Sequence, residues 1–177
     1  MELLRTLETE HLILRKAKPG DLEAIYKNVW SDESLAKYML WIPANSLDEA
    51  KERLEKTIDF QSTNNVFFVC LKESDEAIGF AGVMPNAEEL GVYNDCGICI
   101  AAKFQGKGYG KEVAKALARL IFEELQGTKF HYSCFKENTR SAALCESLGF
   151  KYLGIAKKFR KRDNLEYDSK EFELNKK

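Results

Sequence analysis

The stretch Gln105-Gly106-Lys107-Gly108-Tyr109-Gly110 decides the expected fold. An apolar run, residues 97–101, leads into it, and a helical pattern, residues 111–126, leads out of it. Glycines let a backbone turn tightly and approach a ligand, and the first amides of a helix lack intrahelical acceptors. The helix dipole adds about half a positive charge at the same point. The sequence therefore predicts a phosphate-binding turn between a strand and a helix.

Two other phosphate loops do not fit this stretch. A P-loop needs Gly, four residues, then Gly-Lys-Ser/Thr, but Gly106 to Gly110 is one residue short and Glu112 stands where the hydroxyl is needed. A dinucleotide turn needs Gly-x-Gly-x-x-Gly within a βαβ unit, which the preceding pattern does not predict. The spacing that fits is Gln-x-x-Gly-x-Gly, at Gln105, Gly108 and Gly110. It resembles the pyrophosphate loop of the GNAT superfamily, the acetyl-CoA-dependent N-acetyltransferases, although a turn that only begins a helix would look the same.

Composition is that of an ordinary globular protein. The chain has 177 residues, 45% hydrophobic and 31% charged, with a formal net charge of −1, so no basic field favours nucleic acid. The basic run 157–162 is better explained as a solvated strand end or hairpin. No apolar run approaches the ~18 residues of a membrane span, and residues 1–5 lack the regions of a signal peptide. We therefore expect no membrane partner and no direct nucleic-acid partner.

The five cysteines favour a reducing compartment. Their number is odd and the chain is not short, so a disulfide framework is not expected, and reduced thiols fit a cytoplasmic protein. Cys96 and Cys99 have the spacing of half a zinc site, but they fall in an expected strand, where residues three apart face opposite ways. No second pair with metal-ligand spacing follows, so we expect no metal.

Hydrophobic periodicity predicts a single α+β domain, residues 1–177, with a mixed, mostly antiparallel sheet flanked by helices. Ser31 and Ser46 are expected helix caps, and Gly79 and Gly82 suggest a bulge or a close approach inside a strand. Three consecutive strands should form a meander, and the strand after the long helix should lie parallel to the last of them. In order, the expected elements are strand 9–16, helices 21–30, 31–38 and 46–61, strands 66–71, 77–84 and 92–101, helix 111–126, strand 129–135, a helix capped by Asn138, and strands 150–159 and 167–174.

A second motif makes the resemblance specific. Residues 138–141, Asn-Thr-Arg-Ser, with the later Leu148-Gly149-Phe150, resemble the second GNAT motif, Asn-x-x-Ser/Ala followed by Leu-Gly-Phe. This motif follows Gly110 with one expected strand between, as in that superfamily. The two motifs in this order imply the GNAT fold and acetyl-CoA as the cosubstrate.

A narrower resemblance extends over almost the whole chain. The opening residues 7–15 resemble the first strand of the Rim-type ribosomal-protein N-terminal acetyltransferases, and Ser31-Asp32-Glu33 and Tyr167-Asp168 also fit that branch. The branch includes enzymes that acetylate protein N-termini and others that act on small amines or antibiotics. It implies transfer of an acetyl group to a primary amine by direct attack on the thioester. The identity of the amine acceptor and the formation of a homodimer stay open.

The resemblance also implies which residues would hold acetyl-CoA. Amides of the glycine turn would bind the pyrophosphate, with Lys107 either adding charge or remaining solvated. Backbone of the preceding strand would pair with the pantetheine amides, which requires the fourth and fifth strands to part. Asn138 would bind the pantetheine arm, and Arg140 would either reach a CoA phosphate or lie exposed. The implied set is Ile98, Cys99, Ile100, Gln105, Gly106, Lys107, Gly108, Tyr109, Gly110, Lys111, Asn138 and Arg140.

Asp95 is the candidate general base. It stands two residues before Gly97, where the resembling branch usually has Glu, and being one methylene shorter it would act through a water. The alternative is a plain strand-edge aspartate, with Glu88 and Glu89 as other candidate bases. By the same resemblance, Ser141 would protonate the leaving thiolate, although serine is also common in the first turn of a helix.

Two further positions bear on the chemistry. Many GNAT enzymes place a tyrosine acid seven residues after the Asn of the second motif, and Cys145 stands there instead. Trp41 is the candidate contact for the acceptor amine, through apolar packing or a cation–π contact, with a core tryptophan as the alternative. The departures at Asp95 and Cys145 keep a second function open, a non-catalytic acyl-CoA-binding module.

Overall fold

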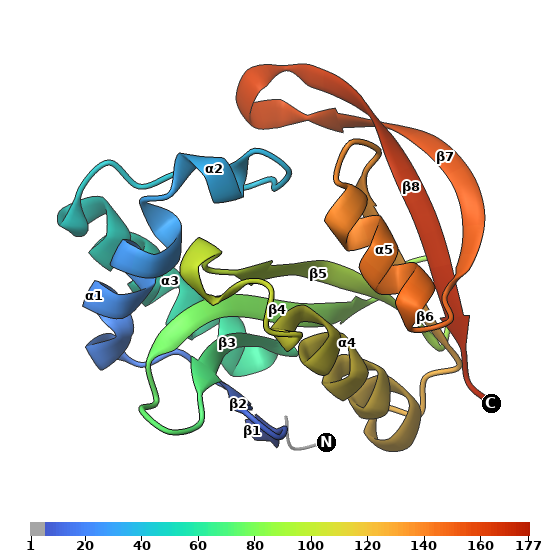
Figure 1. Ribbon diagram of the computed structural model, residues 1–177, viewed down its shortest axis with the longest axis horizontal. Helices are drawn as coiled ribbons and strands as arrows, with labels where there is room; N and C mark the ends of the chain where they lie inside the picture. The colour runs from blue at the N-terminus through green and yellow to red at the C-terminus, as the bar shows by residue number, and fades with distance from the viewer. Residues whose placement is uncertain (1–5) are drawn as a thin grey trace.

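The computed structural model describes residues 6–177 and contains one eight-stranded sheet in the order β1-β2-β3-β4-β5-β6-β8-β7 (Figure 1). Residues 1–5, where the sequence predicts no signal peptide, lie outside the described residues. Every neighbouring pair is antiparallel except β5 and β6, which are parallel as expected. The strands are β1 (Thr6–Glu8), β2 (Leu12–Arg15), β3 (Val66–Leu71), β4 (Ala77–Pro85), β5 (Val92–Ile100), β6 (Lys129–Phe135), β7 (Lys151–Arg160) and β8 (Leu165–Asn175).

Helices cover both faces of this sheet. The first group is α1 (Leu22–Ile25), α2 (Glu33–Ala36) and α3 (Leu47–Thr63), and the second is α4 (Tyr109–Arg119) and α5 (Thr139–Ser147). A 3₁₀ turn precedes α1, and a single π-helical turn extends both α1, through Trp30, and α4, through Glu124. The expected helices 21–30 and 111–126 are thus present, with their last turns widened.

Each helix group has its own hydrophobic core. Ile25, Val29 and Leu54 are buried with Phe68 and Cys99 on one face of the sheet. The larger core on the opposite face contains side chains of α4 and α5, among them Val113, Leu117, Leu120, Ala142 and Cys145, together with Phe130 and Phe172 of the strands. Successive residues of a strand point to opposite faces, so the central strands contribute to both cores. This separation leaves the sheet itself as the wall between the two sides.

The predicted strand 9–16 is shorter in the structure, where only Leu12–Arg15 forms a strand, β2. Leu12 and Leu14 are buried, as their alternation indicates, but the strand begins only at Leu12 and a separate short strand precedes it. The hydroxyl of Thr9 bonds both the N–H and the carbonyl of Leu12, at 3.0 Å each, and the His11 amide donates to the Glu112 carboxylate at 2.7 Å. These polar contacts replace ladder bonds and turn the chain. A distant glutamate on α4 therefore decides a turn that β-propensity alone does not indicate.

Two helix starts were predicted from capping residues, and one prediction is wrong by a residue. Asp32, not Ser31, caps α2, because its carboxylate accepts from the amides of Ser34 at 2.9 Å and Leu35 at 3.4 Å. The second prediction is confirmed, since the Ser46 hydroxyl accepts from the Glu49 amide at 3.1 Å. Aspartate and serine are both strong N-caps, so adjacent candidates cannot be ranked from type alone.

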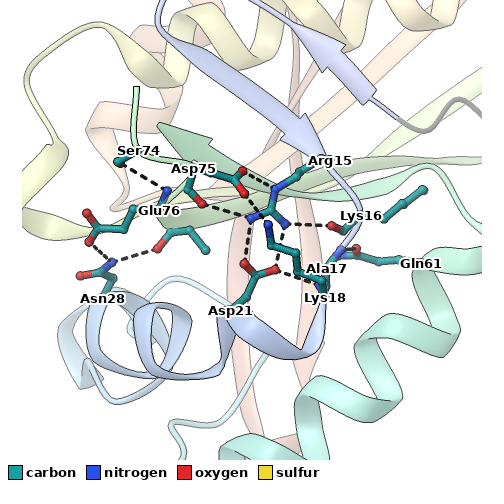
Figure 2. A network of polar contacts seen from close by, with 11 residues as sticks. Arg15, Lys16, Ala17, Lys18, Asp21, Asn28, Gln61, Ser74, Asp75 and Glu76 are labelled. Atoms are coloured by element: carbon teal, nitrogen blue, oxygen red, sulfur yellow. Dashed lines mark hydrogen bonds and ion pairs between the residues drawn. The ribbon is translucent and has the colours of Figure 1, made fainter. Parts of the chain in front are cut away.

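A half-buried guanidinium connects three segments of the first half of the chain (Figure 2). Arg15 at the end of β2 donates to both oxygens of Asp21 before α1, at 2.9 and 2.8 Å, and to Asp75 in the β3–β4 turn at 2.6 Å. Asp21 also accepts from the Lys18 amide at 2.9 Å. Burial makes such a network costly to leave half-satisfied, so it fixes how the first helix meets the sheet.

An extra residue in β5 positions the functional site. Ala81 pairs with Ile98 and Val83 with Asp95, so one residue of β4 faces two residues of β5, a β-bulge. A Cβ on Gly82 would lie 2.7 Å from the Val66 Cα, and one on Gly79 would lie 2.0 Å from the Cys99 carbonyl oxygen. The predicted bulge and close approach at these two glycines are confirmed.

Candidate active site

The parallel strands β5 and β6 part shortly after they begin. They pair only from Val92 with Lys129 to Asn94 with His131, and beyond that point β6 pairs with β8 alone. Cavities of about 500 Å³ and 370 Å³ open beside the gap. Both are lined by Ile98, Tyr132, Asn138 and Ser141. The opening thus joins two chambers, here called the loop cavity and the aromatic cavity.

The glycine turn forms one end of the loop cavity. None of the backbone N–H groups of residues 106–111 donates to a described backbone carbonyl. Gly106 and Gly108 have φ of +79° and +81°, a left-handed conformation that side chains disfavour, and a Cβ on either would meet open space. Free amides at the start of α4, in a turn open to solvent, suit a pyrophosphate. The donor set therefore fits the diphosphate of acetyl-CoA.

Side chains around the glycine turn fix its conformation by hydrogen bonds and leave the loop cavity open. Gln105 donates from Nε2 to the Ile100 carbonyl at 2.9 Å, and its Oε1 accepts a hydrogen bond from Arg140 of α5. Arg140 and Lys111 both line the loop cavity. Lys107 does not, and its ammonium lies 5.6 Å from the centroid of the Phe104 ring. Only its backbone N–H is placed in the turn, so a charge contribution from Lys107 would need a different rotamer.

The last residues of β5 run along the loop cavity. Ile98 and Ile100 line it with their side chains, whereas the Cys99 side chain is buried in the opposite core. Cys99 can therefore contribute only backbone here. On the side away from β4 this backbone has no strand partner after Asn94, and extended backbone with free amide groups can pair with an amide-containing chain. The pantetheine arm is such a chain.

Helix α5 points its first turn at the junction of the two cavities. The Asn138 side chain caps the helix through Oδ1, which accepts from the Ser141 amide at 3.3 Å. The Ser141 Oγ lies 2.9 Å from the Tyr132 hydroxyl oxygen. Asn138, Ser141 and Tyr132 thus stand together where the loop cavity meets the aromatic cavity.

Tyr132 is the residue that sequence reasoning missed. Burial, then the charge of Asp95, raise the pKa of the Tyr132 hydroxyl well above its usual value. It therefore keeps its proton across the physiological range. Its alternation with Phe130 in β6 marks it only as a core residue, and no local pattern shows that the hydroxyl meets Ser141. Cys145, at the position of the usual tyrosine acid, is a buried thiol whose pKa is raised by burial.

Asp95 lies at the point where the two strands part. One carboxylate oxygen accepts from the Gly97 amide at 2.8 Å, and the other accepts from the Ser133 amide of β6 at 3.0 Å. Burial raises the pKa of this carboxyl to about 6, although the two amides oppose the shift. Asp95 also lines the aromatic cavity. It therefore bridges the diverging strands and presents a carboxyl to the aromatic cavity.

The other candidate bases are elsewhere. Glu88 donates its backbone amide to Asn86, and Glu89 pairs with Lys129 at 2.8 Å, both in the exposed loop between β4 and β5. Neither lines the two cavities. Trp41, by contrast, lines the aromatic cavity and meets the Phe80 ring edge-to-face at a centroid distance of 6.3 Å.

Metal ligands and membrane-spanning helices are both absent from the described part of the chain. Within residues 6–177 there is no group of three or more His, Cys, Asp or Glu side chains arranged to hold a metal ion. No helix among the same residues is long and apolar enough to cross a membrane.

Comparison with known proteins identifies the family of the chain. Residues 11–151 match the family model of the acetyltransferase (GNAT) domain. An uncharacterized N-acetyltransferase, p20 of Bacillus licheniformis, is 29% identical over 160 residues, 89% of each chain. The structure resembles a candidate ribosomal-protein-serine acetyltransferase from Vibrio cholerae, with a TM-score of 0.83, 22% identity and coverage of 99% and 100% of the two chains. It also resembles the microcin C7 self-immunity acetyltransferase MccE, crystallised with acetyl-CoA and AMP, with a TM-score of 0.80, 18% identity and coverage of 94% and 93%.

The chain therefore belongs to the GNAT acetyltransferases, N-acetyltransferases that take acetyl-CoA as cosubstrate. The predicted α+β fold, with a mostly antiparallel sheet flanked by helices, is confirmed.

Proposed function

We propose that the chain transfers the acetyl group of acetyl-CoA to a primary amine that enters from the aromatic cavity. The observation that carries this proposal is the junction of the two cavities at Tyr132 and Ser141. The phosphate-binding turn opens to one side of this junction and the Asp95 carboxyl to the other. Cosubstrate and acceptor would thus approach one another through the gap between β5 and β6.

The proposed cosubstrate contacts use the geometry described above. Amides of residues 106–111 bind the pyrophosphate, since the Gln105 amide already donates to the Ala102 carbonyl at 3.2 Å, and Arg140 lies close enough to the turn to add a positive charge. Backbone of residues 98–100 pairs with the pantetheine amides, and the free Nδ2 of Asn138 donates to that arm. A backbone N–H of the same stretch can also polarise the thioester carbonyl as it gains negative charge.

The proposed reaction is a direct transfer with two proton steps. The amine nitrogen attacks the thioester carbonyl, its proton passes to the Asp95 carboxylate directly or through a water, and a C–N bond replaces the C–S bond. The leaving thiolate takes a proton from the Ser141 hydroxyl, which regains one from water, while the Asp95 carboxyl returns its proton to water, so both residues end as they began. Asp95 suits the base role because its pKa of about 6 leaves it ionised but weakly basic at neutral pH. An α-amine needs little help, since about 9% is already neutral at pH 7.

The Rim-type branch suggests a protein N-terminus as one acceptor, and the fold shared with the Vibrio cholerae protein is compatible with it. Small amines, including antibiotics, are the other class. The cysteines are free, and four of the five are buried. This fits a cytoplasmic protein, because an oxidising compartment selects for paired cysteines.

Enzyme assays would test the function. The protein is incubated with acetyl-CoA and a panel of N-terminal peptides, monoamines, polyamines and aminoglycosides, and free thiol is followed with time. Amine-dependent thiol release with a matching mass gain of one acetyl group supports the proposal. Tight CoA binding without turnover on any amine would instead support the acyl-CoA-binding module.

The glycine turn has its own test. We predict that Gly108→Glu abolishes CoA binding, because it puts bulk and negative charge at the free amides and strains a φ of +81°. Gly20→Glu is the matched control, since Gly20 is exposed and lies outside both cavities. No atom lies within 4 Å of a Cβ placed on Gly20, so a side chain fits there. Calorimetry with CoA should show loss of affinity in the first variant only. Unchanged affinity of a folded Gly108→Glu protein would contradict the assignment of the turn.

A further inference from the structure

The aromatic cavity has an unusual wall for an amine site. Six aromatic side chains line it, and five of them also contact one another: Tyr38 and Phe135 at 5.8 Å between ring centroids, Phe135 stacked on Tyr167 at 3.8 Å, and Trp41 against Phe80. Such rings offer large apolar area and negative π faces. The wall therefore favours a flat or apolar group, and it tolerates a single cation beside a ring.

The charge of the cavity is equally restricted. Asp95 is the single carboxylate among its lining residues, and no lysine, arginine or histidine of residues 6–177 lines it. Two carboxylates of β8 are already in ion pairs with lysine ammonium groups, Asp168 with Lys157 and Glu171 with Lys158. A ligand with one ammonium group finds one partner here. A second or third ammonium group would lose its water without gaining a counterion.

Two arginines near the end of the β7–β8 hairpin, which curves over the molecule toward α2 (Figure 1), hold the segment that forms one wall of the cavity. Arg160 donates to the carbonyls of Lys37 at 2.8 Å and Met39 at 3.0 Å. Arg162 donates to the carbonyls of Trp41 at 2.6 Å and Ala36 at 2.9 Å. The segment from α2 to Trp41 is thereby held beside the cavity. Arg160 also donates a hydrogen bond to the Asp163 carboxylate at 2.7 Å, which balances its charge.

We infer that the acceptor is a small amine with one positive charge and an aromatic or apolar body, enclosed by the rings of the aromatic cavity. This inference rests on the proposed function and names its substrate class. The ammonium group would stand beside Asp95 and the body against Trp41 and its neighbours. A volume of about 370 Å³ suits a small molecule. A peptide N-terminus would bring further amide groups against this wall of rings, which a small apolar body does not.

Competition among amines is the first test. Phenethylamine, spermidine, kanamycin and an alanine-initiated tetrapeptide are each titrated in the acetyl-CoA assay and, by calorimetry, into protein loaded with CoA. We expect kcat/KM for phenethylamine to exceed that for each of the others by at least ~10-fold, because only it matches both the charge and the wall. Preferred turnover of the tetrapeptide, of spermidine or of kanamycin would overturn the inference while leaving acetyl transfer intact. Absence of thiol release with every amine would count against the proposed function itself and so against the inference.

Variants of the wall give the second test. Trp41→Ala should raise KM for phenethylamine about 10-fold while KM for acetyl-CoA stays unchanged, and Trp41→Phe should restore most of the affinity. Leu90→Ala is the matched control, because Leu90 is fully exposed on the distant β4–β5 loop. An unchanged KM for phenethylamine in a folded Trp41→Ala protein would contradict the inference. A matched rise in KM for acetyl-CoA would also contradict it, since it would indicate a general distortion.

Discussion

The Tyr132 hydroxyl controls what Ser141 can do. The two oxygens are 2.9 Å apart, and the raised pKa of Tyr132 keeps its proton available as a donor. When Tyr132 donates to Ser141 Oγ, the serine proton is free to point into the cavity junction. A residue on β6 thus orients the proposed acid, in a site where Cys145 replaces the tyrosine that many GNAT enzymes use.

We predict that Tyr132→Phe lowers kcat about 10-fold and leaves KM for acetyl-CoA unchanged. Phenylalanine keeps the packing against Phe130 and Phe150 but cannot align Ser141, and alignment contributes less than the acid itself. Tyr152→Phe makes the same chemical change at an exposed position of β7 and should have no effect. Steady-state kinetics check both. If Ser141→Ala loses as much activity as the double variant of Ser141→Ala with Tyr132→Phe, the two hydroxyls act as one unit. Full activity of Tyr132→Phe would remove the tyrosine from the mechanism.

Asp95 gives a pH prediction with a definite sign. Its pKa of about 6 means that the acid form, which cannot accept a proton, dominates below that pH. We therefore expect kcat/KM to rise tenfold per pH unit up to about pH 6 and then to level until the pKa of the free amine.

The matching variant is Asp95→Asn. Here the amine must lose its proton to water, so kcat/KM should keep rising through pH 6 toward the pKa of the amine. CoA affinity serves as the control for distortion of the strands. The carboxamide keeps one acceptor oxygen for the two amides of Gly97 and Ser133, and a displaced β5 would also weaken CoA binding. A wild-type profile without a break near pH 6 would leave Asp95 with its strand-bridging role alone.

Residue types and spacing predict the candidate cosubstrate site and the candidate acid Ser141 better than the tyrosine that orients this acid or the arginines that hold the cavity wall. Gln105, Gly108 and Asn138 are nominated by motifs whose physics is local, a turn and a helix cap. Tyr132, Arg160 and Arg162 act through partners far away in sequence. Their types are common in strands and turns, so nothing near them in the chain indicates those contacts.

At the scale of the element, the Arg15 network decides how α1 and the β3–β4 turn sit on β2. We predict that Arg15→Met lowers the free energy of unfolding by about 3 kcal/mol, because it leaves the buried Asp21 carboxylate and Asp75 without their shared cation. Urea denaturation measures the change. Arg119→Met, which removes an exposed arginine bonded to the Glu8 carbonyl, should change stability by less than ~0.5 kcal/mol. An equal change in the free energy of unfolding for the two variants would show that the Arg15 network does not stabilise the fold more than an exposed arginine does.

Element order follows from periodicity, but element details depend on distant contacts. The meander β3 to β5, the helix after the glycine turn and β6 are as predicted, since each has a strong local pattern. The division into β1 and β2 depends on Glu112, and the β5 bulge depends on how β4 packs at Gly82. Glycines hint at such places, but they do not say which neighbouring strand takes the extra residue.

At the scale of the whole molecule, the sheet consists of β1 to β5 and β6 to β8, joined by a short ladder. That ladder contains the pairs from Val92–Lys129 to Asn94–His131, and Asp95 adds one side-chain bridge to Ser133. At the far end, Arg160 and Arg162 connect the hairpin to the segment after α2. The gap between the two halves of the sheet is therefore bridged by hydrogen bonds at both ends.

The parted strands carry a wider consequence. A free strand edge on a protein surface invites neighbouring molecules to add their own strands and so to form aggregates. Here the part of β5 without a strand partner on its β6 side lies inside the sheet, between β4 and β6, and not at an outer edge. A slender, flexible arm can enter. The fold thereby keeps backbone groups available for the proposed cosubstrate away from the outer strands β1 and β7, where another chain could add a strand.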